Sequence, residues 1–196
     1  TSASAGIGIG KAVIVEEIRL VIAMQAVTDV EEEVQRFKGA LDETIKATEK
    51  LAEDLATRVG EKEAEIMQGH MMLLADPMLT GEIENSIRND SVNSEYAIEN
   101  VCNMYADMFA SMGDELMQQR ATDMRDIKTR MQQMLMGIQS VDISSLPEGS
   151  IIVAKDLTPS MTAGINPAKV TGIVTELGGK TSHSAILARA LEIPAG

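Results

Sequence analysis

Hydrophobic residues recur at three- and four-residue steps through the middle of the chain, which is the period of an amphipathic α-helix. The first periodic run begins at Asp29, and its acidic first turn suits the positive end of a helix dipole. A second run begins near Glu61. We expect a break or kink in it at Asp76-Pro77, because proline disfavours helical geometry in the residue before it. The inward positions are Val34, Phe37, Leu41, Ile45, Thr48, Ala52, Leu55 and Val59 in the first run, and Ile66, His70, Leu73, Leu74, Ile83 and Ile87 in the second.

Two further helices are predicted, from about Ser94 and from about Gln119. Short connections join the helices, so consecutive helices should be antiparallel, as in a four-helix bundle or two packed hairpins. Methionine is prominent on the expected inner faces. These faces are Ala97, Val101, Met104, Met108 and Met112 in the third helix, and Met124, Ile127, Met131, Met134 and Ile138 in the fourth.

The first residues of the chain have the pattern of strands. Residues 12–15 and 18–22 predict two short strands. Residues 6–10 alternate glycine with isoleucine and resemble a GxGxG nucleotide loop, but no helical pattern comes after them, as that fingerprint requires. We therefore interpret residues 6–10 as strand.

The last third of the chain returns to an α/β pattern. Residues 150–154 and 170–176 predict strands, and Thr158-Pro159 has the form of an N-cap followed by proline at the first position of a short helix. A helical block thus interrupts an α/β unit built from both ends of the chain. We expect an α/β plus all-α fold.

Charge and composition divide the 196-residue chain in the same way. Residues 25–140 carry 23 acidic and 11 basic side chains, whereas the remainder carries 7 and 6, and 12 of the 14 methionines lie between Met67 and Met136. We therefore predict an α/β subdomain of residues 1–24 and 141–196 and a helical subdomain of residues 25–140.

Several functional classes are disfavoured by composition. A net charge of −13 argues against nucleic acid as a partner. No apolar run is long enough for membrane insertion, and the first residues lack the pattern of a secretory signal. A single cysteine, Cys102, permits neither an intrachain disulfide nor a cysteine-based metal site. We expect a cytoplasmic protein.

His183 is the main candidate for chemistry. The strand at 170–176 leads into a glycine turn, and His183 falls in the first turn of the helix after it. Free N–H groups and the helix dipole favour an anion there, and glycines let backbone amides approach a phosphoryl group. The predicted phosphate loop is Gly178, Gly179, Lys180, Thr181 and Ser182.

Other interpretations of His183 remain open at this point. It is a structural residue, a metal ligand, or a nucleophile or general base. Nothing nearby supplies two further histidine or cysteine ligands for a metal. A Ser-His-Asp hydrolase is weakly supported, because Ser182 and Ser184 are adjacent in sequence and need not face the ring.

The motif at 178–189, Gly-Gly-Lys-Thr-Ser-His-Ser-Ala-Ile-Leu-Ala-Arg, closely resembles the phosphohistidine signature of enzyme I of the bacterial phosphoenolpyruvate:sugar phosphotransferase system. Residues 191–195 match the segment directly after that signature in the family, and residues 156–162 resemble a second family motif. Residues 6–12 and 69–76 also fit. Pyruvate phosphate dikinase and phosphoenolpyruvate synthase share the histidine loop but lack a helical insert of this size there.

The resemblance implies a swivelling phosphohistidine β/β/α domain interrupted by a four-helix insert that binds the carrier protein HPr. His183 would be phosphorylated on Nε2 by phosphoenolpyruvate and would pass the phosphoryl group to a histidine of HPr. Thr162, in the second motif, would hydrogen-bond the imidazole and orient it; without the resemblance, a helix-surface threonine is the simpler interpretation.

Matching positions also imply contacts with HPr. Acidic side chains and exposed methionines beside a helix break suit a partner with basic residues around an apolar patch, although methionines that merely fill the core are the alternative. The residue after Glu61, commonly acidic in the family, is Lys62 here. The implied contacts are Glu61, His70, Met72, Leu73, Leu79, Arg120 and Arg125.

The family's full enzyme continues into a (β/α)₈ barrel that binds phosphoenolpyruvate and Mg²⁺ and forms a homodimer. We expect this chain to be a fragment without that barrel, with no metal or cofactor of its own and unable to phosphorylate itself from phosphoenolpyruvate. The alternatives are a nitrogen-branch or dihydroxyacetone-kinase-linked paralogue, or a non-catalytic protein-binding module.

Overall fold

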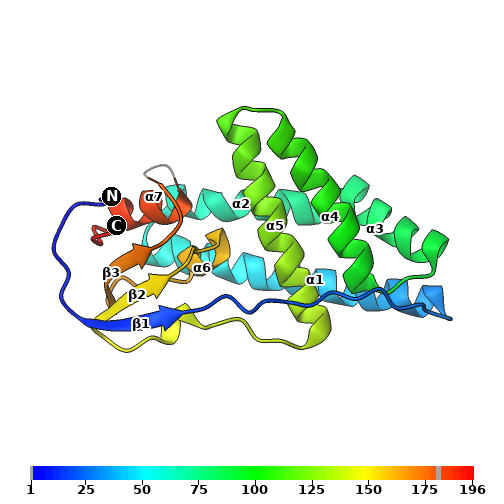
Figure 1. Cartoon of the computed structure of the whole chain (residues 1–196), viewed down its shortest axis with the longest axis horizontal. Coiled ribbons are helices and arrows are strands. Elements are labelled where there is room, and N and C mark those ends of the chain that lie inside the picture. The colour runs from blue at the N-terminus through cyan, green and yellow to red at the C-terminus, as the bar shows by residue number, and fades with distance from the viewer. Residues whose placement is uncertain (1, 180–181) are drawn as a thin grey trace. The chain divides into compact units, whose positions relative to one another are not determined.

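The computed structural model describes residues 2–179 and 182–196 and consists of helices and a small three-stranded parallel sheet (Figure 1). The predicted α/β plus all-α class is confirmed. The backbone divides into two compact units. The α/β unit comprises the stretch up to Ile18, Leu51–Ile66 and the stretch from Ser140, and the helical unit comprises Arg19–Lys50 and Met67–Gln139. In the described part of the chain, no helix combines the length and apolarity that crossing a membrane requires.

The α/β unit contains a sheet in the order β1-β2-β3, with both strand pairs parallel. Short helices follow two of its strands. The elements are β1 (Lys11–Val15), η1 (Ile143–Ser145), β2 (Ser150–Ala154), α6 (Pro159–Ala163), β3 (Val170–Thr175) and α7 (His183–Ala190). Their core includes Val15, Ile152, Leu157, Ile165, Val170, Ile173, Ala188 and Ile193.

The two strand predictions that flank β1 were wrong. Residues 6–10 and 18–22 are extended or irregular and pair in no strand. Steric demand explains the glycines before β1: a Cβ at Gly8 would lie 2.1 Å from the carbonyl oxygen of Thr171, and a Cβ at Gly10 would lie 2.1 Å from that of Gly149. The glycines let this segment lie directly against neighbouring backbone.

The helical unit contains the four predicted helical runs, the second of them divided at the expected proline. Asp76 caps the new helix, because its Oδ1 accepts the Met78 N–H at 2.9 Å and Pro77 occupies the first turn. The helices are α1 (Val30–Arg58), α2 (Glu61–Ala75), α3 (Pro77–Asp90), α4 (Ser94–Ser111) and α5 (Glu115–Met136). The ends of α1 and α2 that meet at Gly60 group with the α/β unit, where the Arg58 guanidinium donates to the carbonyl oxygens of Gly164 and Ile165 at 3.1 Å each.

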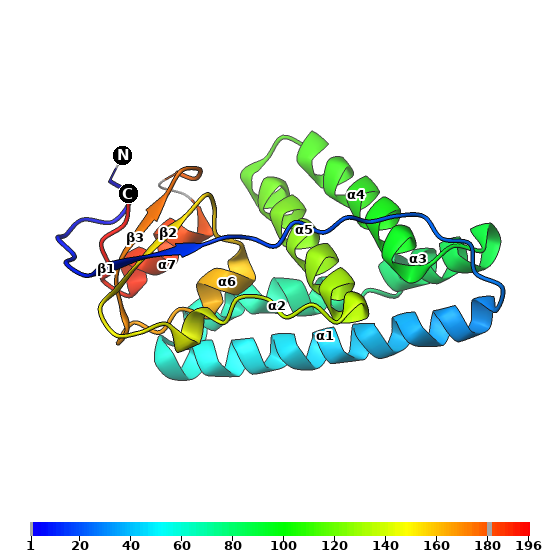
Figure 2. The ribbon, with the colours of Figure 1, turned by 60° about the horizontal axis from the view of Figure 1, so that its bottom comes forward.

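The predicted inner face of α4 was partly wrong. Ala97 and Val101 are buried, but the methionines further along the same stripe are exposed. The buried stripe runs instead through Ile98, Cys102 and Ala106. Small residues permit close approach to α5, which lies beside α4 (Figure 2). The exposed fractions are 55% for Met104, 44% for Met108 and 53% for Met112; on α5, Met134 is 40% exposed while Met124, Ile127 and Met131 are buried.

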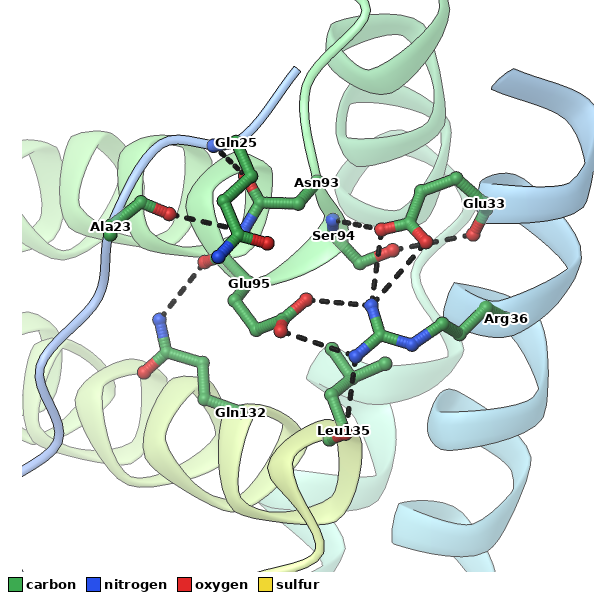
Figure 3. Close-up of polar contacts among 9 residues, drawn as sticks. All are labelled: Ala23, Gln25, Glu33, Arg36, Asn93, Ser94, Glu95, Gln132 and Leu135. Carbon is green, nitrogen blue, oxygen red and sulfur yellow. Dashed lines mark hydrogen bonds and ion pairs between the residues drawn. The ribbon is translucent and has the colours of Figure 1, made fainter. Parts of the chain in front are cut away.

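Side chains from elsewhere in the helical unit hold the amino end of α4 (Figure 3). Asn93 occupies the N-cap position, but its amide instead binds Ala23 O at 3.1 Å and the Gln25 N–H at 2.9 Å. The Glu33 carboxylate, from α1, supplies the cap: its Oε2 accepts the Ser94 N–H at 2.7 Å. The Ser94 hydroxyl donates to the Glu33 carbonyl at 3.3 Å.

Arg36 extends this polar contact to the end of α5 (Figure 3). Its guanidinium donates to Glu95 Oε1 at 2.7 Å, Glu33 Oε2 at 3.1 Å and Leu135 O at 3.1 Å. Burial of the Glu95 carboxylate disfavours its charge, but hydrogen bonding and charge from Arg36 hold the pKa of Glu95 below its ordinary value. Helices distant in sequence are thereby joined by charge-assisted hydrogen bonds.

Replacing Glu33 by alanine should lower the free energy of unfolding of the helical unit by about 1–2 kcal/mol, because the buried Ser94 N–H loses its acceptor. Glu33→Gln should lose less, since an amide oxygen still accepts. The matched control is Glu32→Ala on the exposed side of the same helical turn, with an expected change below about 0.5 kcal/mol. Urea unfolding followed by circular dichroism measures all three. Equal effects at positions 32 and 33 would contradict the capping role.

Candidate functional site

The helices that carry Thr162 and His183 start at one edge of the sheet. In a parallel sheet the carboxyl ends of the strands share an edge, which is where α/β proteins bind ligands. Helix α6 follows β2 and helix α7 follows β3, and the two helices pack against each other. The structure thus brings together the elements of the two predicted motifs.

A glycine turn connects β3 to α7. Gly178 has φ +119°, a conformation that L side chains rarely adopt, so glycine is required there. The Ser182 N–H donates to Gly179 O at 2.9 Å, which closes the turn. Lys180 and Thr181, also predicted for the phosphate loop, lie outside the described residues.

His183 is the first residue of α7, as predicted, and is half-buried. Ser182 is the N-cap, and its Oγ accepts the Ala185 N–H at 3.2 Å. The first N–H groups of a helix have no acceptor within it, and they lie at the positive end of the dipole. A phosphoryl group on the His183 ring would therefore lie near an electrostatically favourable helix end.

Thr162 is buried in α6, with 2% of its surface exposed. Its hydroxyl donates to Thr158 O at 2.9 Å, and Thr158 is itself the N-cap of α6. Because the single hydroxyl proton is used in this bond, the Thr162 oxygen retains only acceptor capacity. It is therefore suited to accept an imidazole N–H, and its role in orienting His183 remains a prediction.

The predicted HPr contacts differ widely in exposure. Met72 is 62% exposed, Glu61 and Arg125 are exposed, and Arg120 is half-buried. The other three side chains are buried, which does not favour direct contact with a partner in this conformation, and their part in HPr binding remains a prediction. They are His70 at 0%, Leu73 at 7% and Leu79 at 1% exposed; both leucines belong to the core of the helical unit.

His70 instead pairs with Asp123, which was not among the predicted site residues. Its Nε2 lies 3.0 Å from Oδ1 of Asp123 on α5, and both residues are buried. A signal existed: Asp123 lies four residues before Ile127 and eight before Met131, which places an acidic residue on an apolar helical face. Only the fold shows that a histidine faces it.

A cysteine nucleophile and a metal centre have little support within the described residues. Burial raises the pKa of Cys102 to about 12, so this thiol is not a nucleophile near neutral pH. Residues 2–179 and 182–196 contain no group of three or more histidine, cysteine, aspartate or glutamate side chains arranged to hold a metal ion.

Comparison with known families and structures agrees with this geometry. The model for "PEP-utilising enzyme, N-terminal" matches residues 1–120, and the model for "PEP-utilising enzyme, mobile domain" matches residues 146–195. A solution structure of an Enzyme I (nEIt) protein superposes with a TM-score of 0.86 at 40% identity, covering 99% of this chain and 79% of that one. The N-terminal domain of "Enzyme 1 - Nitrogen" superposes with a TM-score of 0.68 at 25% identity, covering 98% and 79%.

Two similar curated proteins carry the same name. The phosphoenolpyruvate-protein phosphotransferase of Priestia megaterium is 42% identical over 194 residues, which cover 99% of this chain and 34% of that protein. The corresponding protein of Bacillus subtilis is 43% identical over 193 residues, covering 98% and 34%. The chain spans about a third of the length of these relatives. It belongs to the family of phosphoenolpyruvate-utilising enzymes, and within that family to the N-terminal part of enzyme I.

Proposed function

We propose that this chain is the phosphohistidine and carrier-binding part of an enzyme that transfers a phosphoryl group from phosphoenolpyruvate to HPr, the first step of sugar uptake by the phosphotransferase system. The observation that carries the proposal is the position of His183, the first residue of α7, after a glycine turn at the carboxyl edge of a parallel sheet. The names of the relatives support the same activity.

The chemistry requires a ring nitrogen with a free lone pair. If the Thr162 oxygen accepts the proton of Nδ1, the lone pair is on Nε2, the nitrogen expected to react. Nε2 attacks phosphorus, a P–N bond forms, and the bond from phosphorus to the enol oxygen of phosphoenolpyruvate breaks. In the next transfer a histidine nitrogen of HPr attacks the same phosphorus, and the P–N bond to His183 breaks.

The helical unit is proposed to dock HPr. Residues 25–140 carry a clear acidic excess, and Met72 and Met78 are 62% and 66% exposed on either side of the break before Pro77. Exposed apolar side chains on an acidic unit suit a carrier with basic residues around an apolar patch.

Phosphoenolpyruvate and Mg²⁺ are proposed to bind in the remainder of the longer enzyme, which would also form the dimer contact. The nitrogen-branch alternative is less favoured, because the nitrogen-type structure shares 25% of residues with this chain and the Enzyme I structure shares 40%.

Incubating the chain with phospho-HPr tests the proposal. Mass spectrometry should find an acid-labile phosphate on His183, and a parallel incubation with phosphoenolpyruvate and Mg²⁺ should leave the chain unlabelled. Binding of HPr without phosphate transfer would support a non-catalytic binding module instead. Stable phosphate on a residue other than His183 would refute the assignment.

A further inference from the structure

His70 is a fully buried histidine that the proposed phosphoryl transfer does not use. Its Nε2 contacts Asp123 Oδ1 at 3.0 Å, which joins α2 to α5 within the helical unit. Gly69 lets the carboxylate lie close to α2, since a Cβ there would be 3.5 Å from Asp123 Oδ2. In the part of the chain that the structure describes, His70 Nδ1 is buried without a hydrogen-bond partner.

Stability alone does not account for such a pair. A buried polar atom without a partner carries a desolvation cost, and apolar residues in place of a buried ionic or polar pair are often neutral or stabilising. A directional hydrogen bond does supply specificity, because it is satisfied in one helix register only. The contact between His70 and Asp123 is therefore a candidate for the interaction that sets how α2 lies against α5.

The same two helices present surface residues of the proposed docking site. Met72 follows His70 by two residues, a step of about 200° around a helix, so one side chain is buried while the other is 62% exposed. On α5, Asp123 lies between Arg120 and Arg125 in sequence, and Arg125 is exposed. A rotation or slide of α2 against α5 would change the spacing between these surface groups.

We propose that His70 and Asp123 are positioning residues for carrier docking: their buried hydrogen bond holds α2 and α5 in the arrangement that HPr recognises. This inference rests on the proposed function, because it needs HPr as the docking partner. It assigns His70 a role in the affinity for HPr and no role in the phosphoryl transfer itself.

The test removes both polar groups together, in the double variant His70→Leu/Asp123→Ala, so that no buried charge is left alone. We expect it to remain folded, to bind HPr about tenfold more weakly in a calorimetric titration, and to accept phosphate from saturating phospho-HPr at the wild-type rate. His70→Gln, whose amide N–H still donates to Asp123, should restore most of the affinity. Ile98→Val, a buried change on α4, is the control for general destabilisation.

Three results would overturn the inference: wild-type affinity in the double variant, an equal loss in Ile98→Val, or a fall in the saturated transfer rate with unchanged affinity. If the double variant does not fold, the affinities of His70→Gln and His70→Met for HPr are compared instead. The two side chains are similar in length, but only glutamine has an N–H group that can donate to Asp123. Equal affinities of these two variants would overturn the inference. Failure of wild-type protein to bind HPr would instead refute the proposed docking function itself.

Discussion

Replacing His183 by glutamine should abolish phosphate acceptance from phospho-HPr while leaving HPr affinity unchanged. The expected fall in transfer rate exceeds about 10³-fold, because a covalent relay has no route without its nucleophile. Glutamine is similar in size to histidine and its amide nitrogen is not nucleophilic, so the first turn of α7 and its Ser182 cap should persist. Rapid-quench transfer of labelled phosphate and calorimetric binding of HPr measure the two quantities.

Glu148→Gln is a suitable control for this experiment. Glu148 is exposed and precedes β2, so it lies at the amino edge of the sheet, opposite the edge where α7 begins. Its transfer rate should equal that of the wild type. Residual acceptance by His183→Gln above about one per cent of the wild-type rate would show that another group receives the phosphate.

Replacing Gly10 by alanine should destabilise the α/β unit by about 2–4 kcal/mol. The new Cβ would lie 2.1 Å from Gly149 O and 2.7 Å from Thr171 Oγ1, far inside contact distance. The obstructing oxygen belongs to backbone that precedes β2, so relief requires the first strand to move away from the sheet. Urea unfolding monitored by amide hydrogen exchange in β1 and β2 should show the loss.

The same substitution at Gly39 should have the opposite effect on stability. Gly39 lies on the exposed side of α1, and a Cβ there meets nothing within 4 Å. Alanine in a helix interior is favoured over glycine by about 0.5–1 kcal/mol, so Gly39→Ala should stabilise the helical unit. Destabilisation at both positions, or at neither, would contradict the steric account of Gly10.

Helix boundaries that depend on residues close in sequence were predicted well. The break at Asp76-Pro77, the start of α6 after Thr158 and the start of α7 at His183 all depend on proline geometry or on a side chain capping its own helix. Such signals operate over three or four residues, so they are readable without tertiary information.

Predictions that depended on which surface a residue faces were less successful. The methionine stripe on α4 has the helical period, but it is exposed, because the buried side of α4 runs through Ile98, Cys102 and Ala106 instead. Residues 18–22 have strand-forming composition and pair with no strand. Methionine and β-branched residues suit both environments, so composition alone does not decide between them.

Local chemistry in the sequence determined the turn, the cap and the histidine at the start of α7, because backbone sterics and helix capping act between residues close along the chain. Tertiary structure alone decided that His70 is internal and faces Asp123 across 53 positions of sequence, and that Glu33 caps a helix starting 61 residues later. These contacts result from packing between helices. A periodic pattern shows that a helix has an inner face, whereas the partner of that face is set by the fold.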